Sequence, residues 1–289
     1  MKFLLPIFGF TLLTFFSASA QVSVDVALDQ NEFLPGEAMP LAVRVTNRSG
    51  QPLHLGADPA WLTFSVESQD GFIVFKKSEV PVLGEFTVGS SQVAIKRVNL
   101  EPYFVLTRPG RYHVVATVRI KDWNIAIASP PKNFDIISGA KLWSQNFGVP
   151  DGGVTNRPPE VRKYILEEAN YLSSQLRLYV QVTDESGSHV FKVAPIGRLV
   201  SFSQPETQLD RFSNLHVLWQ SGAADFTYAI VNPNGKILDQ EIYDYVTSRP
   251  RLNMNEIGDV LVVGGVRRIK PGEIPQIETP DELPAPAKP

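Results

Sequence analysis

The chain contains no cysteine in its 289 residues. It can therefore form no disulfide, carry no lipid on a cysteine thiol and use no thiolate as a nucleophile. Its stability must come from buried apolar side chains and hydrogen-bonded backbone. A chain of this length can supply both, because the fraction of surface that is buried rises with size.

The chain also lacks any concentration of charge of one sign. Charged residues make up 20% of the sequence, the formal net charge is −3, and the lysines and arginines are scattered. Nucleic acid or an anionic membrane surface would favour a clustered positive field, so neither is an expected partner. With 43% hydrophobic residues, the composition is that of an ordinary globular protein with room for two domains.

One apolar run stands out, and it lies at the N-terminus. Lys2 precedes an apolar stretch from Phe3 to Phe16, and Ala18-Ser19-Ala20 is a small-residue pattern that signal peptidase cuts. The run is shorter than the about 20 residues needed to cross ~30 Å of hydrocarbon. We predict a signal peptide at residues 1–20, a mature start at Gln21, and a secreted or periplasmic protein with no membrane span after cleavage.

Familiar catalytic and metal-binding motifs are missing as well. No Gly-x-Ser-x-Gly elbow, phosphate-binding Gly-x-x-x-x-Gly-Lys loop or His-Glu-x-x-His pair occurs. The acidic turns at Asp184 and Asp210 lack the dense alternating oxygens of a calcium loop, so we predict turn capping there and no metal or cofactor. The four histidines stand apart in sequence, at His54, His113, His189 and His216. A glycosidase-type pair needs two carboxylates only ~5 to 10 Å apart in space, and the nominal candidates are Glu67, Asp122, Glu167 and Asp210.

The first half of the mature chain alternates apolar and polar residues in short runs, as antiparallel strands do. Leu62–Val66 and Phe72–Phe75 flank Ser68-Gln69-Asp70-Gly71, which suits a type I turn, so we predict a hairpin there. So many short strands, broken by Gly or Pro, predict a β-sandwich of immunoglobulin type over residues 21–140. The other predicted strands are Val22–Val26, Leu41–Val45, Gln92–Val98, Tyr103–Leu106, Tyr112–Ile120 and Asn133–Ile137.

Two local patterns bear on this domain. Pro109-Gly110-Arg111-Tyr112 is similar to the tyrosine corner, in which a Tyr hydroxyl bonds back to the backbone; the alternative is a ring merely half-buried on the sheet. Phe33-Leu34-Pro35-Gly36-Glu37 followed by Val43–Asn47 resembles the opening of bacterial immunoglobulin-like modules. In those modules a Pro-Gly-Glu turn feeds a strand that ends in Asn.

The second half contains an internal repeat. Leu178–Val182 followed by Asp184–Gly187 is echoed by Phe226–Ile230 followed by Asn232–Gly235, so each copy is a strand that enters a turn with Asp or Asn first and Gly last. The period of about 45 residues is close to that of WD-type propeller blades. We therefore predict an all-β second domain over residues 161–270, with two propeller-blade-like antiparallel repeats of four strands each.

Two such repeats leave sheet edges open, because a closed propeller needs about four to eight blades. Another segment, the first domain or another chain must cover them, and a homo-oligomer is one solution. Glu160–Ser174 fits either a helix or a strand, and the repeat favours a strand. Residues 141–160, around Pro150–Gly153, are a predicted linker. The Pro-rich residues 271–289 are predicted to be a disordered tail.

Together these features resemble uncharacterised exported bacterial proteins that pair an N-terminal immunoglobulin-like β-sandwich with a C-terminal propeller-like β-repeat. The resemblance implies an interaction role, so we expect a non-enzymatic binding or scaffolding protein whose partner is a protein or carbohydrate at the cell surface or in the periplasm. The alternative is an extracytoplasmic polysaccharide hydrolase or lyase with its site on the second domain. The aromatic rings expected to bind are Trp123, at a loop tip, and Trp219 and Tyr243, which flank turns. Packing of Trp123 and Trp219 into their own domains is the competing interpretation.

Overall fold

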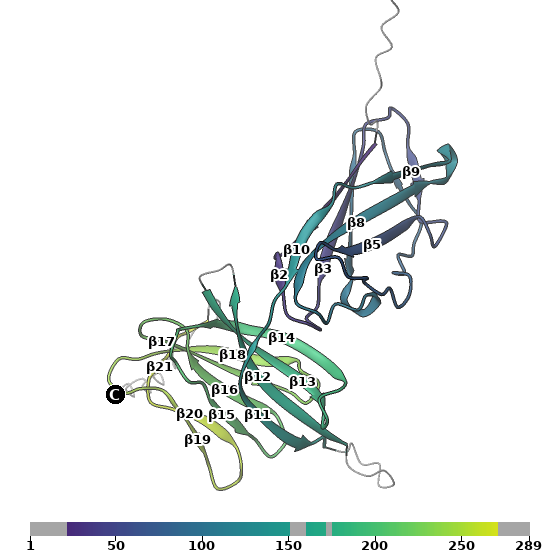
Figure 1. The fold of residues 1–289 in the computed structure, drawn as a ribbon. Helices are drawn as coiled ribbons and strands as arrows, with labels where there is room; N and C mark the ends of the chain where they lie inside the picture. Colours follow the sequence, from purple (N-terminus) through teal and green to yellow (C-terminus); the bar gives the residue numbers. More distant parts are fainter. Residues whose placement is uncertain (1–21, 151–159, 172–174, 271–289) are drawn as a thin grey trace, which may run out of the picture. The chain divides into compact units, whose positions relative to one another are not determined.

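The computed structural model describes residues 22–150, 160–171 and 175–270 (Figure 1). The chain divides into two compact units, Met1–Ile136 and Ile137–Pro289, and the regular secondary structure of the described residues is almost entirely β-strand. The all-β prediction is confirmed. The predicted signal peptide and Pro-rich tail lie outside the described residues.

The two larger sheets of the first unit share one apolar core. Strand β8 (Gly110–Ile120) shows the reason, because every second residue from Tyr112 to Ile120 is fully buried while the residues between them are more exposed. Those side chains join Leu41, Val43 and Val45 of β3 in one cluster. One sheet has the order β1 (Val22–Leu28), β3 (Pro40–Asn47), β7 (Val93–Asn99); the other has β2 (Glu32–Phe33), β10 (Lys132–Ile136), β8, β5 (Leu62–Ser68), with β9 (Ile125–Ala128) also on β8. A small third sheet pairs β4 (Leu53–Leu55) with β6 (Phe86–Val88).

The predicted tyrosine-corner hydrogen bond is present. The Tyr112 hydroxyl donates to the carbonyl oxygen of Arg108, four residues upstream, at 2.5 Å, and the ring is completely buried. Burial also raises the pKa of the Tyr112 hydroxyl. The alternative of a half-buried ring is therefore wrong.

The predicted hairpin of Leu62–Val66 with Phe72–Phe75 is wrong. Strand β5 pairs with β8, and residues 72–75 are not a strand. The Ser68–Gly71 turn is tied to the start of β8, because the Arg111 amide donates to the Asp70 carboxylate. Phe72 then packs edge to face on Tyr112, with ring centroids 5.4 Å apart.

Tyr103–Leu106 is also not a regular strand. Glu101–Tyr103 forms a 3-10 turn (η1), and Phe104 makes only a single bridge to Lys76. The Lys77 amide donates to the Tyr103 carbonyl oxygen and the Val105 amide donates to the Phe75 carbonyl oxygen, so the segment pairs with residues 75–77 through this single bridge.

The second unit begins with a four-stranded antiparallel meander. Its order is β11 (Ala140–Gly148), β12 (Val161–Tyr171), β13 (Gln175–Asp184), β14 (Val190–Leu199). The strand prediction for Glu160–Ser174 is confirmed over Val161–Tyr171. The predicted linker 141–160 is wrong over its first part, because β11 pairs with β12 along Ala140–Gly148. The Gly- and Pro-rich segment begins only after that strand ends.

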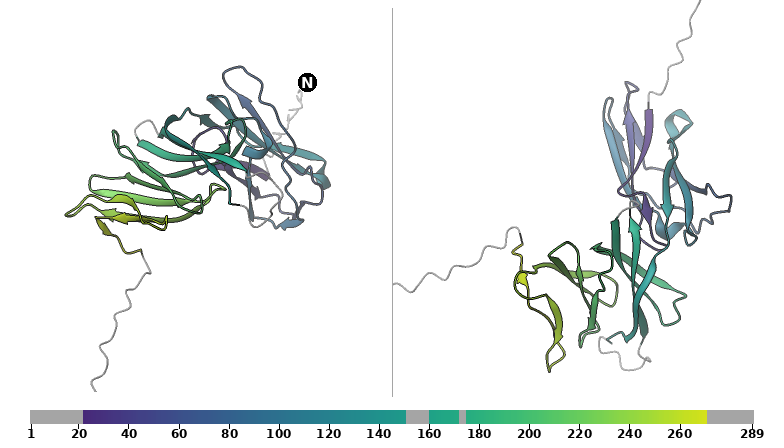
Figure 2. Two further views of the ribbon diagram at one scale, coloured as in Figure 1. Left: turned by 90° about the horizontal axis from the view of Figure 1, so that it is seen from below. Right: turned by 60° about the vertical axis from the view of Figure 1, so that its left-hand side comes forward.

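A second meander packs against the first. Its order is β15 (Glu206–Leu209), β16 (Leu215–Gln220), β17 (Asp225–Val231), β18 (Ile237–Asp244), β21 (Val266–Arg267). Both sheets are antiparallel, as predicted, but the second has five strands where the prediction gave each repeat four. A separate hairpin, β19 (Arg251–Met254) with β20 (Val260–Val263), lies between β18 and β21 in the chain, and Figure 2 shows it as a yellow ribbon beside the green sheet.

The second meander is buried on both faces. One face, with Val217 and Trp219, shares a cluster with Leu166 and Val180 of the first meander. The other face, with Leu218 and other side chains of β16 and β17, packs against the β19–β20 hairpin. This double burial explains why β16 and β17 are almost continuously apolar instead of alternating.

The internal repeat has a shorter true unit than the sequence indicates. Four hairpins turn at an Asp or Asn whose Oδ1 accepts a backbone N–H four or five residues later, and whose turn ends on a residue with positive φ. The last three of these caps follow one another at 22 and 23 residues. The period of about 45 residues is thus two hairpins. The four caps are Asp184, Asp210, Asn232 and Asn255.

Candidate functional site

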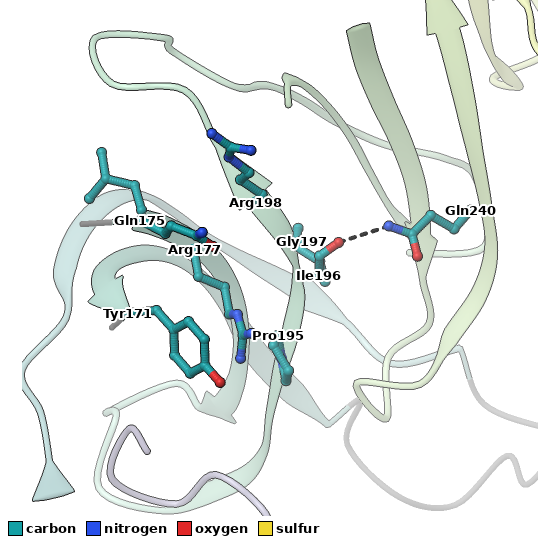
Figure 3. Close-up of a pocket in the computed structure, with 9 residues that line it drawn as sticks. Tyr171, Gln175, Arg177, Pro195, Ile196, Gly197, Arg198 and Gln240 are labelled. Carbon is teal, nitrogen blue, oxygen red and sulfur yellow. Dashed lines mark hydrogen bonds between the residues drawn. The ribbon is translucent and has the colours of Figure 1, made fainter. Parts of the chain in front are cut away.

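The candidate site is an open hollow of about 380 Å³ in the second unit, where β14 passes the end of the β12–β13 hairpin (Figure 3). Strand β14 is an edge strand of its sheet, which permits a proline in it. The hollow is lined by Tyr171, Gln175, Leu176, Arg177, Pro195, Ile196, Gly197, Arg198 and Gln240.

A β-bulge shapes one wall of the hollow. Leu178 pairs with Gly197 and Tyr179 pairs with Pro195, so Ile196 is the extra residue of β14. Gly197 has φ of +147°, and a Cβ on it would lie 2.9 Å from the Trp219 ring. Glycine is therefore required at this position for the close approach of the ring.

Two side chains of the second meander hydrogen-bond to the backbone of the bulge. The Trp219 indole N–H donates to the carbonyl oxygen of Arg198 at 2.8 Å, and the Gln240 side-chain amide donates to the carbonyl oxygen of Ile196 at 2.8 Å. The second of these bonds is drawn in Figure 3. Both bonds satisfy backbone acceptors of an edge strand, so the wall of the hollow is fixed before any ligand arrives.

The charged side chains that line the hollow are the two arginines, Arg177 and Arg198. Arg177 and Arg198 are direct cross-strand partners, and the Arg177 guanidinium carbon lies 3.6 Å from the centroid of the Tyr171 ring. Figure 3 shows Arg177 extending toward Tyr171 and Pro195 while Arg198 extends the other way. No carboxylate is among the described residues that line the hollow. The arrangement suits a ligand with negative charge at more than one point.

The three predicted binding rings lie elsewhere. Trp219 is 1% exposed, so its ring cannot stack on a ligand; it packs in the core, as the competing interpretation expected. Trp123, in the 3-10 turn Lys121–Trp123 (η2), is half-buried against the first core, again as the competing interpretation expected. Tyr243 is half-buried, and its hydroxyl donates to Glu241. Burial raises the pKa of Tyr243 to about 12.

Trp123 belongs to the first unit, whereas Trp219 and Tyr243 belong to the second, where Trp219 is internal. The residues that line the hollow were missed by the sequence reasoning. One signal was present: Pro195 and Gly197 interrupt a strand two residues apart, which is typical of a bulge.

The four candidate carboxylates are divided between the two units. Glu67 and Asp122 lie in the first unit, and the Glu67 carboxylate is 3.6 Å from the His113 ring. Glu167 and Asp210 lie in the second unit, and burial raises the pKa of Glu167. No group of three or more His, Asp or Glu side chains within residues 22–150, 160–171 and 175–270 is placed to hold a metal ion.

Asp210 instead belongs to a closed polar cluster. His216 is 4% exposed, its Nε2 lies 3.2 Å from Asp210 Oδ2, and its Nδ1 lies 2.6 Å from the Tyr228 hydroxyl. Because an ionised carboxylate only accepts, Nε2–H donates to Asp210, and Nδ1 shares a hydrogen bond with the Tyr228 hydroxyl. Burial raises the pKa of Tyr228. The cluster fastens the Asp210 turn to β17, and it is closed to a substrate.

No family model and no curated protein matches the chain. Among solved structures, the chain is similar to the crystal structure of Spo0M, a sporulation control protein from Bacillus subtilis. Sequence identity is 10%, the TM-score is 0.31, and the similarity covers 63% of this chain and 91% of Spo0M. A likeness at this level carries no argument about fold or function. No helix in the described parts of the chain is long and apolar enough to cross a membrane.

Proposed function

We propose that the chain is an exported, non-enzymatic binding protein that acts outside the cytoplasm and holds an acidic carbohydrate in the hollow beside β14. The observation that carries the proposal is the lining of the hollow: guanidinium groups of Arg177 and Arg198 and side-chain amides of Gln175 and Gln240, with no carboxylate among the described lining residues. Charge-assisted hydrogen bonds from guanidinium to carboxylate are among the strongest that a protein makes.

The form of the hollow favours a carbohydrate over a small organic anion. It is open, and the side chains of Leu176 and Pro195 line it together with the arginines and glutamines. A sugar ring likewise presents an apolar C–H face and polar edges. An open site with planar amides and guanidinium groups at its rim matches that pattern.

The proposal includes a finer description of the two units. The Tyr112 hydroxyl bond and the two sheets that share one core support an immunoglobulin-like first domain. The consecutive meanders built from hairpins of similar length support propeller-like layers in the second domain. In a scaffold of this kind the loops and edge strands are accessible to a ligand, and the hollow lies beside the edge strand β14.

Isothermal titration of the mature chain, from Gln21 onward, tests the proposal. The ligands are tetragalacturonate, the same tetramer with its carboxylates reduced to alcohols, and a hexaglutamate peptide. We expect binding of tetragalacturonate that weakens as sodium chloride is raised, and little binding of the reduced tetramer. Equal binding of the acidic and reduced tetramers, or tighter binding of the peptide, contradicts the proposal.

A matched pair of variants locates the site. Arg198→Gln should lower the affinity for tetragalacturonate about tenfold, which corresponds to the loss of one charge-assisted hydrogen bond. Arg119→Gln removes the same charge from an exposed position on β8 of the first unit and should leave the affinity unchanged. Equal effects of the two variants would place the binding elsewhere.

A further inference from the structure

A second hollow lies directly beyond the first along the chain. After Arg198 the chain leaves β14, turns at residues 200–203 and enters β15, and a hollow of about 440 Å³ opens at this crossing. Its lining is Phe202, Ser203, Gln204, Pro205, Glu206, Gln220, Arg249 and Arg251.

Phe202, at the rim of this hollow, combines an unfavourable backbone conformation with an exposed apolar side chain. Its φ is +65°, a conformation that bulky L-residues avoid, and its side chain is fully exposed to solvent. Strain and exposure of a large apolar ring both oppose folding. A residue that combines them in one place is a candidate for a binding role.

The rest of the second hollow mixes donors with an acceptor. Glu206 accepts a hydrogen bond from the Leu252 amide at 2.9 Å and lies 3.6 Å from the Arg251 guanidinium. Gln220 donates to the carbonyl oxygens of Gly222 and Ala223. These side chains are thus held in place, and together they present groups that suit hydroxyls, which both donate and accept.

The two hollows are neighbours on one support. Arg198 and Phe202 are four residues apart, so their Cα atoms can be no more than about 14 Å apart. The end of β16 fixes both sides of the crossing: Trp219 donates to the Arg198 carbonyl oxygen, and the Val200 amide donates to the Gln220 carbonyl oxygen at 3.0 Å.

We propose that the second hollow is a further subsite for the same acidic carbohydrate, so that the ligand is an oligomer with one sugar held at Arg198 and a later one stacked on the Phe202 ring. The inference rests on the proposed function. It adds that Phe202 and the polar groups around Glu206 recognise the ring face and hydroxyls of a sugar that need not be charged. It therefore assigns the chain a polymer as its natural ligand.

The test compares galacturonic acid with tetragalacturonate on the full mature chain. We expect the tetramer to bind at least about tenfold more tightly, because it reaches both hollows. Phe202→Gly should lower tetramer affinity about fivefold, the loss expected for one stacked ring, and leave monomer affinity unchanged. Phe212→Ala, which removes another exposed phenylalanine of the same unit, should change neither affinity.

The glycine variant also separates binding from folding. Glycine adopts positive φ without strain, so the melting midpoint of Phe202→Gly should be unchanged or higher while tetramer affinity falls. Binding of acidic ligands with equal monomer and tetramer affinity, or an unaffected Phe202→Gly variant, would overturn the subsite and leave the proposed function standing. Absence of binding by both acidic ligands would overturn the proposed function, and this inference with it.

Discussion

At the scale of single residues, the same type of turn recurs in the second unit, and the surroundings of its closing glycine decide how much that glycine contributes to stability. Asp184 and Asn232 open equivalent turns, each closed by a glycine with φ near +75°. A Cβ on Gly187 would meet nothing within 4 Å, whereas a Cβ on Gly235 would lie 2.7 Å from Lys192. The two glycines share a backbone requirement, and only Gly235 also has a packing requirement.

This difference predicts unequal costs for the same substitution. Gly187→Ala should lower the free energy of unfolding by about 1 kcal/mol, from the positive φ alone. Gly235→Ala should cost about 1 kcal/mol more, because the Lys192 side chain must also move. Urea denaturation of the two variants measures both values. Equal costs would show that the neighbouring side chain adjusts freely.

The Asp210 cluster gives a pH-dependent prediction. Burial opposes ionisation of Asp210, but hydrogen bonds from the Asn214 side chain and amide, from His216 and from the Phe212 amide outweigh it and hold the pKa below its ordinary value. A depressed pKa in the folded state means that the ionised group stabilises the fold above the ordinary carboxyl pKa of 3.8. That stabilisation is lost as pH falls through the lower folded value.

Asp210→Asn should therefore destabilise the protein by about 1 to 2 kcal/mol at pH 7, and by progressively less as the pH falls below the ordinary carboxyl pKa of 3.8. Asparagine can keep the turn, as Asn232 and Asn255 do at equivalent positions. The measurement is the free energy of unfolding in urea across this pH range. A pH-independent difference between wild type and variant would contradict the assignment.

At the scale of elements, the β19–β20 hairpin acts as the cover of the second meander. Leu252 packs toward Leu218, Phe226 and Tyr228, while Leu261 on the partner strand is 55% exposed. The hairpin therefore has two different faces: the face with Leu252 packs on the second meander, and the face with Leu261 is exposed to solvent. Its inner contacts keep the apolar side chains of β17 out of water.

A pair of identical substitutions tests this arrangement. Leu252→Ala should lower the free energy of unfolding by about 1 to 3 kcal/mol, because it removes partly buried apolar surface and leaves a gap in the packing. Leu261→Ala should change it by less than about 0.5 kcal/mol, as expected at an exposed position. Thermal denaturation followed by circular dichroism compares the two, and similar losses would mean that both faces are covered.

The predictability of each element follows from where its hydrogen-bond partner lies. The strand at Tyr112–Ile120 and the turns at Asp184 and Asn232 were predictable, because alternation and turn residues are local properties. The pairing of β5 with β8 was not, since the partners are almost fifty residues apart and a turn signal at Ser68–Gly71 suggested a nearer partner. The hollow depends on a bulge opposite Leu178, and its location is likewise a property of the paired strands.

At the scale of the whole molecule, export remains a prediction from residues 1–20. Secretion from an expressing cell should yield a chain whose N-terminal residue is Gln21, as determined by mass spectrometry of the mature protein. Retention inside the cell with Met1 intact would contradict the predicted location.

Truncation after Lys270 should leave the melting midpoint nearly unchanged, since that cut keeps the ion pair of Lys270 with Asp239.

Self-association is also a matter of the whole molecule. The sequence left open whether another segment or another chain covers the sheet edges of the second unit. The β19–β20 hairpin covers one face of the second meander from within the chain. Light scattering of the mature protein decides whether a second copy adds to this: a dimer would indicate that self-association covers the edges, and a strict monomer would indicate that they are covered within one chain.

The sequence by itself determined the β class, the turn positions and the apolar faces, because strand periodicity and turn chemistry act over a few neighbouring residues. Tertiary structure alone decided that Trp219 is internal and that Arg177 and Arg198 line one hollow. It also decided that Phe202 stands exposed at the edge of the next hollow. The physical reason is that cross-strand pairing and sheet stacking join residues far apart in the chain, and their burial depends on what the fold places against them.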